Sequence, residues 1–200
     1  MLAVNMQRRS SSGFTLIELM ITLAIAAILL MVAVPNLSAY RRNAELTSAA
    51  NTFMAGLNTA RSEAMKRGRN AIVVPTNNGS NWNGGWVVFV DVNGNQTFNE
   101  GTDFVVASQA ELPTGVNITA PATSIAGGST PYIMFDASGY SKLKTSGPAA
   151  VTLSFERTDG TTQENLNQTR RIKVAFTGRV RMCKPASATD TNCTFSDSAQ

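Results

Sequence analysis

The chain opens with one long apolar segment, and its pattern changes twice after that. Residues 14–34 form a run of twenty-one residues in which Glu18 is the only charged side chain. A helix rises 1.5 Å per residue, so about 20 apolar residues suffice to cross a bilayer core. The run therefore predicts a transmembrane or filament-core helix over residues 14–34, directly before Pro35.

Helical periodicity resumes after Pro35 in an amphipathic segment, residues 35–69. Apolar positions at alternating spacings of four and three predict one buried stripe: Leu46, Ala50, Phe53, Leu57, Ala60 and Ala64. Gly68 is a plausible end of the helix. We expect one long helix from Phe14 to about Arg67, bent or locally opened at Pro35, whose second half packs on a soluble domain.

From Asn70 the pattern changes to short β-rich runs separated by Gly, Asn, Ser and Pro. No run between them looks helical, so the strands should pair as antiparallel hairpins. The predicted strands are 71–74, 86–92, 104–107, 116–119, 132–135, 151–155, 171–176 and 180–183. The expected fold class is therefore α+β, with one long N-terminal helix packed on the antiparallel sheets of a single globular domain over residues 70–200.

Glu18 needs a physical explanation, because a carboxylate at the centre of a bilayer costs about 2.5–3.5 kcal/mol on insertion scales. Its natural partner is a new positive charge close by. The surrounding sequence is Gly13-Phe14-Thr15-Leu16-Ile17-Glu18, preceded by a short leader that contains Arg8 and Arg9. This combination resembles the class III signal of type IV pilins and type II secretion pseudopilins, and the fold expected from that resemblance is pilin-like.

The resemblance implies a specific maturation. A prepilin peptidase would cut after Gly13, remove residues 1–13 and methylate the new amino terminus at Phe14. Glu18 would then face the terminal ammonium of a neighbouring subunit during assembly. The alternative is an ordinary secretory signal peptide cut after residues 37–39, but the apolar run is too long for that and its acid is misplaced.

Four later segments narrow the resemblance to the GspH/FimT family, which contains the H-type pseudopilin of type II secretion and the minor pilins FimU and FimT. They are residues 60–65, 86–91, 135–139 and 177–181. The resemblance implies a subunit of a type IV pilus or related filament, with an H-type pseudopilin as the alternative. Its partners would be other pilin or pseudopilin subunits, the prepilin peptidase and, before assembly, the bacterial inner membrane.

Composition restricts the chemistry. The net charge is +4, and it falls to +2 if Arg8 and Arg9 are removed with the leader. The chain has no histidine, which removes the commonest general base and metal ligand. Because a nucleophile needs a nearby base, we expect neither enzymatic activity nor a cofactor.

The two cysteines, Cys183 and Cys193, bear on localisation. They could be free thiols in a cytosolic protein, but behind an export signal a disulfide is expected. Two arginines flank each end of the apolar span, so the positive-inside rule gives a tie. The cysteine pair favours a single-pass protein with its C-terminal domain in the periplasm, and later in a pilus or pseudopilus.

Residues 91–100 resemble a calcium loop, because alternate oxygen-bearing residues can point at one hard cation. The ligands would be Asp91, Asn93, Asn95 and Glu100. The stretch departs from the EF-hand pattern in the positions of its glycine and its last acid. We therefore prefer a hairpin loop in which Asn-Gly supplies positive φ angles.

Six cations lie within fifteen residues near the C terminus, with no acid among them: Arg170, Arg171, Lys173, Arg179, Arg181 and Lys184. Cations two residues apart project to one face of an extended chain, where guanidinium groups could track a nucleic-acid backbone. Residues 178–181, Gly-Arg-Val-Arg, also match the Gly-Arg-x-Arg element that DNA-binding FimT-type minor pilins use in transformation. Candidate DNA contacts are thus Arg179, Arg181, Arg171, Lys173 and Lys184. There are two alternatives to DNA binding. The cations could lie on a solvated strand face, or they could bind an acidic patch of a neighbouring pilin.

Overall fold

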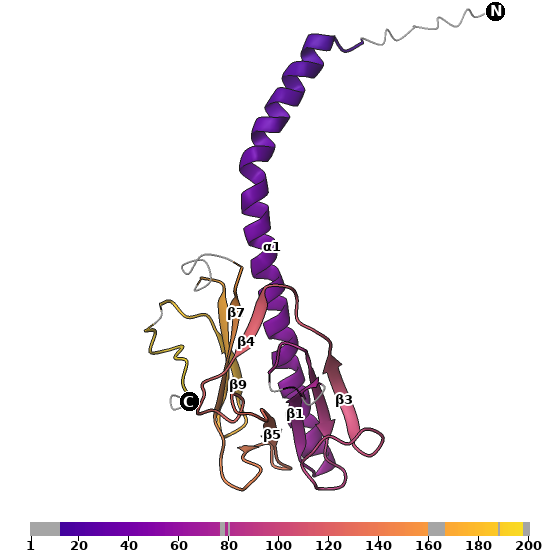
Figure 1. The fold of residues 1–200 in the computed structure, drawn as a ribbon, viewed down its shortest axis with the longest axis vertical. Helices are drawn as coiled ribbons and strands as arrows, with labels where there is room; N and C mark the ends of the chain where they lie inside the picture. The colour runs from indigo at the N-terminus through magenta and orange to yellow at the C-terminus, as the bar shows by residue number, and fades with distance from the viewer. Residues whose placement is uncertain (1–12, 77–78, 80, 160–166, 188, 198–200) are drawn as a thin grey trace, which may run out of the picture. The chain divides into compact units, whose positions relative to one another are not determined.

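The computed structural model describes residues 13–76, 79, 81–159, 167–187 and 189–197, with only the backbone described for 32–36 (Figure 1). The chain divides into two compact units, residues 1–41 and 42–200. We describe each unit by itself. Helix α1 (Leu16–Arg67) contributes residues to both.

The first unit holds the N-terminal part of α1. The sequence allowed the helix to be bent or locally opened at Pro35. The backbone is helical through Pro35, so the helix is not opened there. The large apolar side chains between Leu16 and Met31 are exposed, from 53% to 81%. In the described part of the chain, no helix combines the length and the apolar character that a membrane crossing requires.

The second half of α1 forms the centre of the second unit. The six residues of the predicted stripe are at most 1% exposed, which confirms it. Gly56 lies against Trp86, because a Cβ atom at this position would come within 2.6 Å of the indole ring. Gly68, with φ at +63°, follows the last helical residue as predicted, and the amide of Arg69 donates to the carbonyl of Ala64 at 3.2 Å.

Nine strands follow α1 within the described residues. They are β1 (Ala71–Pro75), β2 (Trp86–Val90), β3 (Phe104–Gln109), β4 (Val116–Thr119), β5 (Ile133–Phe135), β6 (Ser141–Lys142), β7 (Val151–Arg157), β8 (Thr169–Val174) and β9 (Val180–Cys183). Each of the eight predicted strands is present with shifted or identical ends. The short strand β6 lies in a segment that its turn residues predicted to be a loop.

The strands form two antiparallel sheets, which we call sheet A and sheet B. Sheet A has the order β3-β2-β1-β5-β6, and sheet B the order β4-β7-β8-β9. The predicted antiparallel pairing is confirmed, but hairpins alone do not build it. β1 pairs with β5, and β4 pairs with β7, across long connections.

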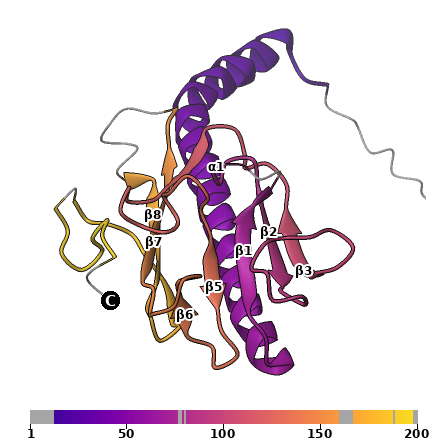
Figure 2. The same cartoon turned by 60° about the horizontal axis from the view of Figure 1, so that its bottom comes forward.

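Both sheets bury one face against the second half of α1, whose surroundings are visible in Figures 1 and 2. Phe53 of α1 lies at the centre of the core. Its ring makes edge contacts with Trp82, Trp86 and Phe155 at centroid distances of 5.4 to 5.5 Å. Such contacts add to the stability that burial of apolar area provides.

Charged side chains fix sheet B to α1 at the rim of this core. Arg157 is 4% exposed and donates to Glu45 at 3.0 Å and to both carboxylate oxygens of Asp159 at 2.9 and 2.6 Å. Arg170 donates to Asn43 of α1 at 2.7 Å. These contacts set the position of β7 and β8, and therefore of the cations that β8 carries on its other face.

Candidate assembly and binding sites

The N-terminal candidate site is exposed. Phe14 is 75% exposed, and a Cβ atom added at Gly13 would meet no other described atom within 4 Å. The arginines of the leader, Arg8 and Arg9, lie outside the described residues. The bond between Gly13 and Phe14 is therefore sterically open on the side that the structure describes.

Glu18 has a local partner at the start of α1. The amide of Glu18 donates to the hydroxyl oxygen of Thr15 at 3.3 Å, and that hydroxyl donates to the Glu18 carboxylate at 3.4 Å. Thr15 thus caps a helix that begins at Leu16, and a carboxylate in the first turn is favoured by the helix dipole. The Thr-x-x-Glu spacing is the sequence signature of such a cap. Besides the assembly role expected for it, Glu18 therefore has a local role in the cap of α1.

Three of the segments that suggested the GspH/FimT family meet at one point in the structure. Arg61 of α1 donates to the carbonyls of Gly139 at 3.0 Å and Thr177 at 3.3 Å. Gly178 has φ at +78°, and a Cβ atom there would overlap with the carbonyl oxygen of Gly139. The glycine of the Gly-Arg-x-Arg element is thus required by the packing of two turns on α1.

The turn that contains Gly139 is ordered by Asp136. Its carboxylate accepts from the amides of Ser138 and Tyr140 at 2.9 and 3.0 Å, and pairs with Lys142 at 2.6 Å. Burial opposes ionisation of Asp136, but these donors outweigh burial and hold its pKa below the usual value of 3.8. This part of sheet A contacts the connection between β8 and β9 of sheet B through Arg61 and through the Ser141 amide, which donates to the carbonyl of Phe176 at 2.9 Å.

Three of the five candidate DNA contacts are accessible. Arg179 and Lys184 are exposed, and Arg181 is half-buried. Arg181 of β9 stands opposite Lys173 of β8 in the antiparallel register. Lys173, Arg179 and Arg181 also share the lining of one small hollow of about 10 Å³. These side chains bring positive charge together at the outer edge of sheet B.

The other two candidate contacts, Arg171 and Lys173, are covered. They share a face as their spacing predicted, but they are only 7% and 1% exposed. Arg171 donates to the carbonyl of Cys193, and Lys173 donates to Thr194 and Ser196. These two candidate contacts are therefore less accessible than the other three, because the end of the chain folds over them. Burial lowers the pKa of both side chains.

The structure contains the disulfide between Cys183 and Cys193, whose Cα atoms are 5.9 Å apart. Cys183 is the last residue of β9, and Cys193 is 2% exposed. The bond therefore fixes the start of the covering segment beside the edge of sheet B.

The suggested calcium loop uses its most buried carboxylate internally. Asp91 is 2% exposed, and its two oxygens accept from the amides of Gly94 at 2.7 Å and Gln96 at 2.9 Å. The other suggested ligands are exposed: Asn93, Asn95 and Glu100. In the described ranges, no group of three or more His, Cys, Asp or Glu residues is arranged to hold a metal ion. The local hydrogen bonds are those of a loop between strands.

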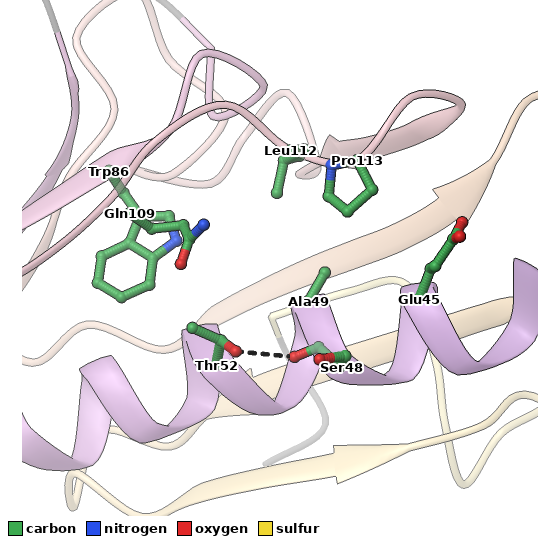
Figure 3. A pocket seen from close by; sticks show the side chains of 8 residues that line it. All are labelled: Glu45, Ser48, Ala49, Thr52, Trp86, Gln109, Leu112 and Pro113. Atoms are coloured by element: carbon green, nitrogen blue, oxygen red, sulfur yellow. Dashed lines mark hydrogen bonds between the residues drawn. The ribbon is translucent and has the colours of Figure 1, made fainter. Parts of the chain in front are cut away.

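A cavity of about 330 Å³ lies between α1 and the connection from β3 to β4 (Figure 3). Figure 3 shows Leu112 and Pro113 across from Ala49, with Trp86 at one end and Glu45 at the other. The Thr52 hydroxyl donates to the carbonyl of Ser48 at 2.9 Å. The carboxylate of Glu45 pairs with Arg157 at 3.0 Å. The cavity is lined by both polar and apolar side chains.

This arrangement, a long helix with an exposed apolar N-terminal part and a helix–sheet domain, defines a pilin-like subunit. The family model of the type II transport protein GspH matches residues 49–178, and the prokaryotic N-terminal methylation motif matches residues 8–34. The chain belongs to the GspH family and is a subunit of the pilus or pseudopilus class. The methylation motif and the family imply a membrane-anchored protein.

Two solved structures are similar to the chain. The type IV minor pilin FimU of Pseudomonas aeruginosa is 17% identical with a TM-score of 0.51, over 72% of this chain and 92% of that one. The minor pseudopilin EpsH from the type 2 secretion system of Vibrio cholerae is 16% identical with a TM-score of 0.49, over 72% and 99%. No curated protein sequence matches the chain. The FimU likeness confirms the predicted α+β, pilin-like fold.

Proposed function

We propose that the chain is a minor subunit that enters a type IV pilus or related filament after cleavage between Gly13 and Phe14. The single observation that carries this proposal is the methylation motif over residues 8–34, which includes Gly13, Phe14 and Glu18. Residues 1–13 are then a removed leader, 14–34 the membrane and filament-core helix, and 35–69 the amphipathic part of the pilin domain. Residues 70–200 form its β-rich part. The protein works by assembly and not by catalysis.

The start of α1 supports a physical mechanism for assembly. Thr15 holds the Glu18 carboxylate at the first turn of the helix. Cleavage creates an ammonium group at Phe14, and a carboxylate in an apolar medium gains from an opposite charge far more than it would in water. A neighbour's ammonium that approaches Glu18 therefore sets the axial register between two subunits. The exposed apolar side chains of α1 supply the remaining contact area.

The test compares Glu18→Ala and Glu18→Gln with the wild-type chain. Both variants remove the charge, and the glutamine keeps the size and a hydrogen-bonding group. We expect normal membrane insertion and cleavage but little protein in sheared filaments. Thr15→Val, which removes the cap and keeps the charge, should assemble at a reduced level. Wild-type amounts of Glu18→Gln in filaments would contradict the proposal.

We further propose an inner-membrane precursor with its C-terminal domain in the periplasm. The disulfide between Cys183 and Cys193 supports this, because such bonds persist in oxidising compartments. The prepilin peptidase is the expected processing partner. Protease added to spheroplasts should degrade the domain from outside, and protection of the domain would contradict this topology.

An H-type pseudopilin of type II secretion is a second candidate, and the GspH family model favours it. Its ligands would be other pseudopilins. Crosslinking of the chain in intact cells separates the two systems. Recovery of minor pilins supports the pilus, whereas recovery of pseudopilins supports the secretion system.

Binding of DNA is a third candidate, and the accessibility of Arg179, Arg181 and Lys184 favours it. Contacts to phosphates would be independent of sequence and strongly weakened by salt. In a gel-shift series at low salt, Arg179→Ala with Arg181→Ala should lose retention, while Arg67→Ala on α1 serves as the control. Equal retention by both variants rejects the role.

A further inference from the structure

The outer face of sheet B is covered by the end of the chain. We call residues 193–197 the C-terminal strap. In Figures 1 and 2 the yellow C-terminal part runs along the side of β7 and β8 that lies away from α1. The disulfide of Cys193 tethers the strap to the end of β9.

The strap is held by side chains of the sheet beneath it. Lys173 donates to the carbonyl and hydroxyl of Thr194 at 3.3 and 3.0 Å, and to the carbonyl of Ser196 at 3.1 Å. Thr152 of β7 donates to the same Ser196 carbonyl at 2.8 Å. Arg171 donates to the carbonyl of Cys193. Within the four residues 193–196, three peptide oxygens and one hydroxyl thus accept hydrogen bonds from two cations.

These acceptors do not carry the charge that the two cations call for. Among the described residues, no ion pair joins Arg171 or Lys173 to a carboxylate. Glu156 and Asp190 act on Arg171 only through space. The strap brings one carboxylate of its own, Asp197, which also acts on Lys173 only through space, and its Oδ1 is buried without a hydrogen-bond partner. Nε of Arg171 is buried without a hydrogen-bond partner. Buried charges are normally paired with opposite charge, so neutral peptide oxygens occupy a place suited to an anion.

The strap can leave without breaking the sheet. β8 is an inner strand whose main chain is paired with β7 on one side and β9 on the other. The contacts with Arg171 and Lys173 use side chains, so their loss leaves the strand ladder intact. Removal of the strap would join these two cations to Arg181 and Arg179, since Lys173 already shares a hollow with both.

We propose that the outer face of sheet B is a docking surface for an acidic peptide segment of an assembly partner, and that the C-terminal strap is its displaceable placeholder. The outer face of sheet B already binds the strap through hydrogen bonds from Arg171 and Lys173 to the strap's peptide oxygens. The carboxylates of a partner peptide would add the negative charge that these oxygens lack. The guanidinium of Arg171, with Nε unused, is suited to hold a carboxylate through two parallel hydrogen bonds. Other subunits are the partners that the family implies, which favours protein over nucleic acid as occupant. The partner class rests on the proposed assembly function.

The test measures binding of a short fluorescent peptide of alternating glutamate and serine to the full chain in detergent. A stop codon after Cys193 removes the strap residues that contact Lys173 and Thr152, and it keeps the disulfide and the Cys193 residue that Arg171 contacts. Because the strap then no longer covers the outer face of sheet B, the apparent affinity for the peptide should rise about tenfold. A stop codon after Asp197 is the matched control, since it leaves the strap in place, and should bind as the wild type does. Phe195→Ala keeps the chain length and removes the ring that lies 5.5 Å from the Arg171 guanidinium, and should give a smaller gain.

Three outcomes decide the matter. Loss of the gain on Lys173→Gln in the shortened chain supports the proposal. No gain in either the shortened chain or Phe195→Ala overturns it. A larger gain for a single-stranded oligonucleotide than for the peptide overturns it in favour of nucleic acid. None of these measurements depends on cleavage at Gly13 or on Glu18, so they can fail while the proposed filament function holds.

Discussion

Sheet B buries cations on both of its faces, Arg157 on one and Arg171 and Lys173 on the other, and the surroundings of these charges differ. Arg157, on the face toward α1, is 4% exposed and pairs with Glu45 and Asp159. Lys173, on the outer face, is 1% exposed and bonds only to neutral oxygens of the strap and to no carboxylate in the described residues. Arg157 therefore ties sheet B to α1 through ion pairs, whereas Lys173 is the cation that we propose to serve a partner.

The largest effect should come from Gly178→Ala, because this residue lies in the connection between β8 and β9 that packs against Gly139. The new Cβ would overlap with the carbonyl of Gly139 at a positive φ angle. Strain and overpacking together should lower the free energy of unfolding by about 3 kcal/mol. Urea unfolding measures this. Gly94→Ala, with a similar φ but open surroundings, should lose about 1 kcal/mol, and equal losses would contradict the packing argument.

Replacement of the paired cation should have the next largest effect. Arg157→Met leaves Glu45 and Asp159 without their partner, but both carboxylates are about 40% exposed and can be hydrated. We therefore expect a loss of about 2 kcal/mol in urea unfolding. Arg42→Met, on an exposed pair with an N to O distance of 4.0 Å, should change stability by less than about 0.5 kcal/mol.

Replacement of the unpaired cation should have little effect on the fold. Lys173→Met removes a buried charge and fills a similar volume, so the free energy of unfolding should stay within about 1 kcal/mol of wild type. The same denaturation experiment tests it. A loss as large as that of Arg157→Met would remove the distinction between the two faces.

The pH dependence should differ between the two faces as well. The hydrogen bond from Arg157 lowers the pKa of Asp159, so its contribution to stability is lost as pH falls below the ordinary value of 3.8. Burial lowers the pKa of Lys173, so its protonated form disfavours the fold and stability rises as pH approaches 10.5. Arg157→Met should remove part of the acid dependence, and Lys173→Met part of the alkaline dependence. Unfolding free energies measured across both ranges check the two signs.

The sequence predicts the parts of this molecule that follow from local periodicity. The stripe that includes Phe53 and Leu57, the stop at Gly68 and the positions of the main strands all follow from it. Strand β6 does not, because two polar residues within a turn-rich segment carry no hydrophobic period. The pairing of β1 with β5 depends on a long connection that no local pattern specifies.

The sequence likewise predicts some features of the candidate sites and not others. The spacing of Thr15 and Glu18 makes the helix cap readable from the sequence. Alternation along β8 correctly places Arg171 and Lys173 on one face, but it does not show that residues more than twenty positions away cover that face. Burial of a charged strand face by a distant segment is a tertiary effect.

The central claim is that cleavage creates a positive charge at Phe14 for the carboxylate of Glu18. Mass spectrometry of the amino-terminal peptide of the mature protein tests it most directly. We expect this peptide to begin with N-methylated Phe14. A mature chain that begins at any other residue, or that retains the leader in assembled filaments, would contradict the account.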